Sequence, residues 1–180
     1  KYDPAGRLWR VCGDDACTTI SAQYLYDLNS NRIGGFTAAG AISASYDEQD
    51  RLLSYGGATY SYTANGELQV KSDAGGNTYY DYDALGNLRQ VILPDGADID
   101  YVVDGRSRRV AKKIDGTVVQ AFLYEDQLRP VAELDAAGEV VSRFVYGDKV
   151  NVPEYLVKGG VTYRLVSDHL GSPRRVLDAA

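Results

Sequence analysis

A glycine recurs at a nearly constant interval along the chain, and this repeat constrains the fold more than any other feature of the sequence. The recurring glycines are Gly13, Gly35, Gly57, Gly76, Gly96, Gly116, Gly138 and Gly160. Subtracting neighbouring residue numbers gives intervals of 22, 22, 19, 20, 20, 22 and 22 residues. A unit of about 20 residues is too small to bury a core by itself, so it is stable only when it stacks on its neighbours. The repeat therefore predicts an array of similar structural units.

A row of tyrosines runs in phase with the glycines. Its members, which we call the ladder tyrosines, are Tyr2, Tyr26, Tyr46, Tyr62, Tyr82, Tyr101, Tyr124 and Tyr146. The residue two positions before a ladder tyrosine is usually apolar or aromatic, as in Tyr24 before Tyr26 and Phe122 before Tyr124. Positions i and i+2 share one face of a β-strand. We therefore expect rows of aromatic rings along one face of a sheet, where they stabilise neighbouring strands.

Two kinds of turn alternate along the units. One follows the tyrosine, as in the segment YDALG that begins at Tyr82, where an aspartate can cap backbone N–H groups and a glycine tolerates positive φ. The other contains the recurring glycine, often as Gly-Gly or Asp-Gly, which is a strong hairpin signal. The glycines expected in these hairpin turns are Gly35, Gly57, Gly76, Gly96, Gly116, Gly138 and Gly160. Because the aspartate recurs with the turn, we interpret it as a turn cap, not as a glycosidase carboxylate or a calcium ligand.

The predicted fold is all-β, with essentially no helix. Two strands in each repeat would give roughly sixteen strands, and an open twisted sheet curls when it has more than about ten. We therefore expect repeated antiparallel β-hairpins in a curved or spiralling sheet, which is a strip of a β-shell. Residues 1–154 are expected to form the hairpin array, and residues 155–180, which depart from the repeat, a closing segment.

Charge and hydropathy exclude several classes of partner. The formal net charge is −6, so nucleic acid is not an expected partner. No apolar run approaches the roughly 18 residues that a membrane-spanning helix needs. The sequence starts inside a repeat and contains no methionine, so we expect it to be a piece of a longer polypeptide or a processed product.

One cluster of basic residues interrupts this acidic chain. Its members are Arg106, Arg108, Arg109, Lys112 and Lys113. We expect a solvated strand face on which these side chains pair with Asp98, Asp100 and Asp104. Contact with an acidic partner or with nucleic acid is the alternative.

Few residues are candidates for chemistry. Cys12 and Cys17 are five positions apart, which leaves open either a disulfide across a turn, typical of an oxidising compartment, or two unpaired thiols. A structural zinc ion needs four ligands, and only His169 could join the cysteines. Ser167, Asp168 and His169 are consecutive, but neighbours on a strand point to opposite faces, so we expect no catalytic triad. We predict no cofactor, no metal and no enzymatic activity.

Two motifs give the chain a resemblance to a known family. Units of the form YDxxGR, clearest from Tyr2 to Leu8, and the tail YRLVSDHLGSPR that starts at Tyr163 resemble the Rhs/YD-repeat family. This family includes bacterial polymorphic toxins, toxin-complex cage components and the animal teneurins. The residues that match its core motif are Asp168, His169, Leu170, Gly171, Pro173 and Arg174. The sequence holds no match to the family's self-cleavage segment, so protease and toxin activities are not carried over to it.

The resemblance implies a non-catalytic structural scaffold of a secreted or exported bacterial protein, outside the cell or on its surface. Such a scaffold would encapsulate or present a partner polypeptide, such as a toxin domain, or contact neighbouring YD repeats. The alternative is an extracellular carbohydrate-binding or adhesive module, or a self-assembling fibre subunit. Tyrosine rows could stack on glycans, and the edges of a sheet could pair with another copy of the chain.

Overall fold

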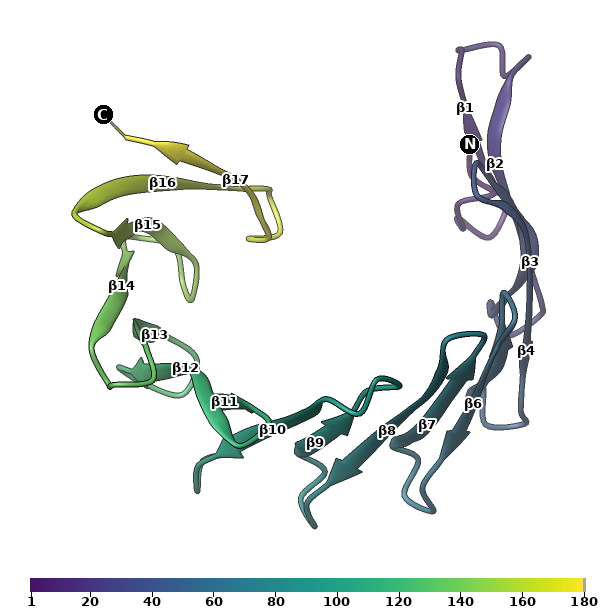
Figure 1. The fold of residues 1–180 in the computed structure, drawn as a ribbon. Helices are drawn as coiled ribbons and strands as arrows, with labels where there is room; N and C mark the ends of the chain where they lie inside the picture. Colours follow the sequence, from purple (N-terminus) through teal and green to yellow (C-terminus); the bar gives the residue numbers. More distant parts are fainter. Residues whose placement is uncertain (180) are drawn as a thin grey trace. The chain divides into compact units, whose positions relative to one another are not determined.

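The structure is a computed structural model that describes residues 1–179, which form 17 β-strands and no helix (Figure 1). It consists of two compact units, Lys1–Tyr79 and Tyr80–Ala180. We describe each unit by itself and call them the first unit and the second unit. The prediction of an all-β chain built from antiparallel hairpins is confirmed.

Strands that follow one another in the chain pair antiparallel along residues 10–79 and again along residues 88–178. The strands of the first unit are β1 Arg10–Cys12, β2 Ile20–Tyr26, β3 Arg32–Thr37, β4 Gly40–Tyr46, β5 Leu52–Tyr55, β6 Ala58–Tyr62 and β7 Leu68–Asp73. Strand β8, Gly76–Tyr82, begins in the first unit, where it pairs with β7, and ends in the second. The other strands of the second unit are β9 Leu88–Ile92, β10 Asp98–Val103, β11 Arg109–Ile114, β12 Thr117–Tyr124, β13 Pro130–Leu134, β14 Val140–Tyr146, β15 Pro153–Lys158, β16 Val161–Ser167 and β17 Pro173–Asp178.

Within each unit, the ladder tyrosines gather at one end of the strands. Successive connections between antiparallel neighbours must lie at opposite ends. Strands β2, β4 and β6 finish with Tyr26, Tyr46 and Tyr62, so these rings lie at the same end of the first unit. Strands β12 and β14 finish in the same way with Tyr124 and Tyr146 in the second unit. We call this the tyrosine end of each unit.

A β-bulge recurs at the tyrosine end. In the β4–β5 hairpin, Ser45 pairs with Ser54 but Tyr46 pairs with Leu52, so Leu53 is an extra residue in β5. The register shifts at the same place after Leu25, Ser61, Val102, Leu123, Val145 and Val166. A bulge bends its strand and increases the local twist. Repetition of the bulge therefore gives each of these hairpins the same local shape.

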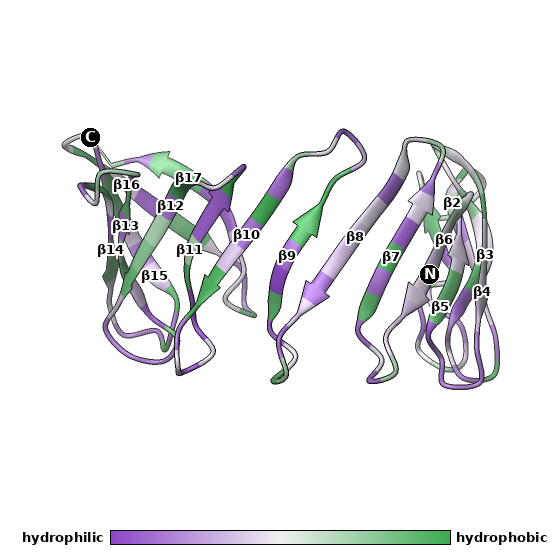
Figure 2. Ribbon diagram, turned by 60° about the horizontal axis from the view of Figure 1, so that its bottom comes forward, coloured by the Kyte–Doolittle hydropathy of each residue, from purple (hydrophilic) through white to green (hydrophobic). Residues whose placement is uncertain are grey.

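The core of the described residues is thin, because each unit is a single layer of strands. The buried apolar residues are all small or medium-sized: Ala22, Ala58, Val91 and Ala132. Hydrophilic and hydrophobic residues alternate along strands such as β7 (Figure 2). Strand β8 alternates between half-buried and exposed positions throughout. The ladder tyrosines are half-buried, except Tyr2, which is 71% exposed. Cohesion must therefore come from contacts within the layer.

Gly35 does not lie in a turn, so its predicted role is wrong. It lies inside β3 opposite Tyr24, and the two-residue turn falls at residues 38–39. At φ +135° its backbone approaches β2 so closely that a Cβ atom would overlap the carbonyl oxygen of Gln23. The β2–β3 pairing runs further than the repeat spacing suggested. In the β3–β4 hairpin, Gly40, at φ +119°, is the glycine that follows the turn.

The other predicted turn glycines lie in or beside turns, in three settings. Gly76, at φ +117°, opens β8 directly after the turn at residues 74–75. Gly57, Gly116 and Gly160 are the second residues of two-residue turns in which both φ angles are positive, the conformation that suits the twist of a hairpin. Gly96 and Gly138 occupy the fourth position of longer turns, at residues 93–97 and 135–139.

The expected boundary between residues 154 and 155 falls inside β15. This strand pairs with both β14 and β16, and β16 pairs with β17, so the hairpin pattern continues to Asp178. A distinct closing role for residues 155–180 stays a prediction.

Candidate functional site

The aspartate that follows a ladder tyrosine closes a five-residue turn. At residues 47–51, the N–H of Asp47 donates to the carbonyl of Arg51 and the N–H of Asp50 to the carbonyl of Asp47, both at 3.0 Å. Oδ1 of Asp47 accepts the N–H groups of Gln49 and Arg51, both at 2.9 Å. The carboxylate thus satisfies backbone donors that the turn would leave without a partner. Asp50, at φ +60°, holds the position that glycine fills in most copies of the turn.

The same backbone bond across five residues recurs through both units. We call these segments the aspartate turns, and they cover residues 3–7, 27–31, 47–51, 63–67, 83–87, 93–97, 104–108, 125–129, 135–139 and 168–172. In three of them Thr63, Leu93 or Glu125 stands at the first position in place of aspartate. The turns at residues 93–97 and 135–139 join β9 to β10 and β13 to β14, at the end away from the ladder tyrosines.

An arginine at the end of the turn links the aspartate to the next ladder tyrosine. Nε of Arg51 lies 2.7 Å from Oδ2 of Asp47, and the Arg51 guanidinium lies over the Tyr62 ring, 5.3 Å from its centroid. Arg7 and Arg108 each pair with the aspartate at the first position of their turn, and Arg129 pairs with Asp126 at the second position. Each of these arginines stacks on the ladder tyrosine of the next repeat. A cation over an aromatic face is attracted by its quadrupole. Each such arginine therefore couples one hairpin to the next.

The tyrosine hydroxyl completes this link. Tyr62 donates its O–H to the carbonyl of Leu52, the first residue after the preceding aspartate turn, at 2.8 Å. The same bond joins Tyr26 to Leu8, Tyr46 to Arg32, Tyr124 to Arg109 and Tyr146 to Pro130. In a β-bulge part of the ladder bonding is lost, so a carbonyl there is free to accept a side-chain donor. The sequence predicted the rings but carried no signal for this bond.

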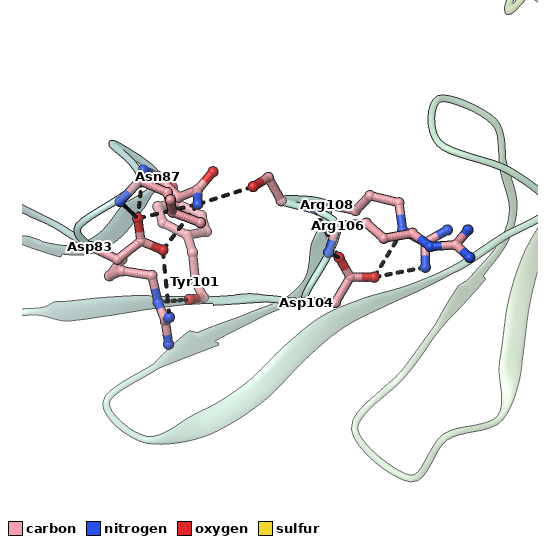
Figure 3. Close-up of polar contacts among 9 residues, drawn as sticks. Asp83, Asn87, Tyr101, Asp104, Arg106 and Arg108 are labelled. Carbon is pink, nitrogen blue, oxygen red and sulfur yellow. Dashed lines mark hydrogen bonds and ion pairs between the residues drawn. The ribbon is translucent and has the colours of Figure 1, made fainter.

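Successive aspartate turns also contact one another directly. In the second unit, Asn87 donates to Oγ of Ser107 at 3.3 Å (Figure 3). Nη1 of Arg108 donates to the carbonyl of Asp126 at 2.8 Å. In the first unit, Arg7 reaches the carbonyl of Asp27 in the same way at 2.9 Å. Side chains of one turn thus hold the backbone of the next.

In several aspartate turns these contacts lower the pKa of the carboxyl group. The Arg108 guanidinium, with backbone N–H groups beside it, lowers the pKa of Asp104 to about 2 (Figure 3). The N–H of Leu128 and the side chain of Arg129 lower the pKa of Asp126 to about 2. In the first unit the pKa of Asp47 is lowered chiefly by the N–H of Arg51. Hydrogen bonds to the charged form of a carboxyl always act in this direction.

One aspartate turn reverses the polarity of this pair. Thr63 replaces aspartate and Glu67 replaces arginine, and the Thr63 hydroxyl donates to the Glu67 carboxylate. Oγ1 of Thr63 still accepts the N–H of Glu67, at 3.2 Å. The side-chain hydrogen bond between the first and fifth residues of the turn is kept, because the first residue is now the donor and the fifth the acceptor.

Two positions interrupt the tyrosine row. In most repeats the ladder tyrosine directly precedes an aspartate turn, but in β10 that position is occupied by Val103. Tyr101 lies two residues before it. This corrects its predicted place: Tyr101 corresponds to the residue two before the ladder position, as Tyr24 does. In β16 the ladder position holds Ser167, whose Oγ is buried and makes no hydrogen bond among the described residues.

The core motif contains one more aspartate turn. Oδ1 of Asp168 accepts the N–H groups of Leu170 and Ser172, both at 3.0 Å, and Gly171 has φ +84°. His169 and Leu170 are exposed at the tip of the turn, and Pro173 and Arg174 open β17. Nε of Arg174 lies 3.9 Å from Oδ2 of Asp168. The Asp168 carboxylate is thus committed to the turn, and the arrangement does not resemble a triad.

The basic cluster does not pair as expected. Arg108 forms an ion pair with Asp104, but no ion pair among residues 1–179 includes the other four cations. Both carboxylate oxygens of Asp98 accept from the Gln90 amide, at 3.0 and 2.9 Å. The expectation therefore holds for Arg108 alone.

A disulfide joins Cys12 to Cys17. Between them, Asp14 accepts the N–H groups of Thr18 and Thr19 at 3.0 and 2.9 Å, and Cys17 has φ +59°. Cys17 thus stands where glycine stands in most aspartate turns. The bond fixes a conformation that is costly for a residue with a Cβ atom.

The described surface offers little for cofactor chemistry. A depression of about 470 Å³ in the second unit is open to solvent and is lined by Asp81, Arg89, Gln90 and Asp100, among others. Within residues 1–179, no three or more histidine, cysteine, aspartate or glutamate side chains are placed to hold a metal ion. None of these residues forms a helix long and apolar enough to cross a membrane.

Hairpins closed by aspartate turns and tied together by tyrosine and arginine define a YD-repeat β-scaffold. The Teneurin YD-shell family matches residues 1–180, and the chain belongs to this family. The resemblance seen in the sequence is thereby confirmed.

This chain matches only a small part of its relatives, which are much longer proteins. Teneurin-1 of Mus musculus is 26% identical over 186 residues, which span 99% of this chain and 6% of that protein. The tRNA nuclease WapA of Bacillus subtilis is 30% identical over 132 residues, which span 70% of this chain and 6% of that protein. Among solved structures, the crystal structure of TcdB2-TccC3-Cdc42 superposes with a TM-score of 0.48 and 12% identity, covering 97% of this chain and 14% of that one.

Proposed function

We propose that this chain is a structural segment of a YD shell whose wall encloses or presents a partner polypeptide, such as a toxin domain. The observation that carries the proposal is the link from each hairpin to the next. Asp47, Arg51 and Tyr62 form this link in the first unit, and Asp104, Arg108 and Tyr124 form it in the second. Every residue of the link serves cohesion of the strands.

A wall of this kind has to be stiff although it is one layer thick. Few apolar side chains are buried, so stacked rings and paired arginines supply the resistance to bending and opening. Backbone hydrogen bonds between strands close the wall to a protease, because a protease needs an extended, unpaired segment. The chain itself contributes no catalysis in this proposal, and the nuclease activity of WapA is not carried over to it.

A secreted or exported location fits the same proposal. A disulfide such as Cys12–Cys17 persists in oxidising environments and is rare where thiols are kept reduced. Membership of the Teneurin YD-shell family is consistent with it. We therefore propose that the chain lies outside the cell or on its surface.

Limited proteolysis of the whole polypeptide that contains this chain tests the proposal. We expect the enclosed or presented polypeptide to be cleaved at least about tenfold more slowly than the same polypeptide alone, because cleavage requires the wall to open. Paired substitutions Tyr62→Ala and Tyr124→Ala should abolish the protection. Tyr2→Ala is the matched control, because this tyrosine is 71% exposed and should leave protection intact. Equal cleavage rates with and without the wall would refute enclosure.

Carbohydrate binding, adhesion or fibre formation is the second candidate. The observation in its favour is the ring of Tyr79 in β8, which is 47% exposed and so open to stacking on a sugar or packing on another copy. Light scattering after size exclusion would detect such assembly, and a glycan array would detect sugar binding. A monomer that binds no glycan removes this candidate.

A further inference from the structure

Arg109 differs from the arginines that link the hairpins. Its guanidinium lies over the Tyr101 ring, 3.8 Å from the centroid, which is closer than for Arg51 or Arg108. The latter two also pair with an aspartate, whereas no hydrogen bond or ion pair among the described residues satisfies the Arg109 guanidinium. Arg109 is exposed. A guanidinium fork is therefore held in place by an aromatic ring with its donors open to solvent.

Lys112 adds a second cation on the same face. It lies directly opposite Tyr101 in the β10–β11 pair, so the two side chains share a face of the sheet. Across the other edge of β11, Lys112 is opposite Gln120. Glu133, which lies opposite Phe122 in the next strand pair, accepts the Gln120 amide at 2.6 Å. Lys112 forms no ion pair with it or with any other described residue.

The neighbouring charges do not cancel this pair. Lys113 lies opposite Asp100, one residue along, and therefore on the other face of the strand. Arg108 is neutralised by Asp104. Arg109 and Lys112 thus form a local positive site on a chain whose formal net charge is −6. An anion can therefore pair with both cations without first displacing a carboxylate of the chain from them.

We propose that Arg109 and Lys112, with the ring of Tyr101, bind an acidic side chain of the polypeptide that the wall encloses or presents. This inference rests on the proposed function and names the chemistry of its partner at one place. A guanidinium matches a carboxylate with two parallel hydrogen bonds, and the ring restricts the guanidinium to one orientation. The arginine, held in one orientation, fixes the geometry of the bound carboxylate, and the lysine adds a second positive charge.

Binding of labelled peptides to the folded chain tests the proposal by fluorescence anisotropy. The probe is a glutamate-rich peptide, compared at low and physiological salt with a glutamine-substituted peptide of the same length. We expect Arg109→Ala and Lys112→Ala each to weaken binding by about fivefold, and the double variant by more. Lys113→Ala is the matched control, because it removes the same charge from the opposite face, and it should change binding by less than about twofold. Circular dichroism confirms that each variant folds.

Each other outcome counts against the site. Equal losses for Lys112→Ala and Lys113→Ala would mean that net charge alone attracts the peptide. Equal binding of both peptides would remove the acidic partner, and tighter binding of a single-stranded oligonucleotide would assign the site to nucleic acid. If the wild-type chain fails to bind while the wall still protects its partner from proteolysis, this inference is wrong and the proposed function stands. If the chain binds the glutamate-rich peptide but the wall does not protect its partner from proteolysis, the acidic-side-chain site stands and the proposed enclosure is wrong.

Discussion

Strand β5 is flanked by two turns that solve the same problem in different ways. At residues 47–51, the Asp47 carboxylate caps two N–H groups, and Arg51 reaches from the turn to the ring of Tyr62 in the next strand. At residues 56–57 the chain reverses on two glycines with φ of +55° and +92°, and a Cβ on either would meet nothing within 4 Å. The first turn therefore ties neighbouring hairpins together through side chains. The second closes one hairpin through backbone freedom alone.

The largest expected difference between the two turns appears in acid. The folded-state pKa values of Asp104 and Asp126 are about 2, and that of Asp47 is lowered, whereas an unfolded aspartate titrates near 3.9. Below pH 4 the unfolded chain binds more protons than the folded one, so lowering the pH favours unfolding. The contribution of these aspartates is thus fully present above about pH 4 and is lost as the pH falls towards 2.

Urea unfolding at pH 5, 4, 3 and 2.5 measures this loss, and the free energy of unfolding should fall steadily over that series. Hydrogen exchange locates it: the N–H of Arg51, bonded to Asp47, should lose protection before the β5–β6 pair around residues 56–57. The variant Asp104→Asn with Asp126→Asn should show a shallower dependence on pH. Stability that is constant from pH 5 to pH 2.5 would show that the carboxylates do not hold the turns.

Removing a ring should give the next largest effect. Tyr62→Ala deletes the stacking partner of Arg51, the bond to the Leu52 carbonyl and a half-buried ring, so we expect a loss of about 3 kcal/mol in the free energy of unfolding. Tyr62→Phe removes the hydroxyl alone and should cost about 1 kcal/mol. Leu53→Ala, at a bulge residue that is 40% exposed, is the control. A cost for Tyr62→Ala no greater than the control would contradict the cohesive role of the ladder.

The sequence predicted what repeats and missed what depends on register. Repeated aspartate, tyrosine and glycine predicted hairpins and aspartate turns, because their turn chemistry is local. The positions of Gly35 and Tyr101 were predicted wrongly because each strand continues two residues beyond them. Such an extension changes which glycine lies at the turn and which residue is the last of the strand. A period of about 20 residues tolerates such a slip without any visible change in composition. The bond from Tyr62 to the Leu52 carbonyl was beyond prediction, because it depends on a bulge in another strand.

The glycine turn should be sensitive to its own backbone and to little else. Gly57→Ala forces a Cβ into a conformation with φ of +92°, although space is open, so we expect a cost of about 1–2 kcal/mol. Gly57→Asn should cost less, since asparagine adopts positive φ more readily. Thermal unfolding of both variants measures the difference. If asparagine costs as much as alanine, backbone conformation is not what limits this turn.

The smallest effect is also the sharpest test of the comparison, because it measures coupling between hairpins and not stability. A double-mutant cycle of Arg51→Ala with Tyr62→Ala should give a coupling energy of about 0.5–1 kcal/mol, the size of a cation–π contact that solvent still reaches. A second cycle of Gly57→Ala with Tyr62→Ala should be additive, because these residues lie at opposite ends of the β6 hairpin arm and Gly57 offers no side chain to the ring. Urea unfolding of the single and double variants supplies both values. Coupling in the second cycle and none in the first would mean that strand pairing transmits the effect, and the division between a linking turn and a closing turn would fail.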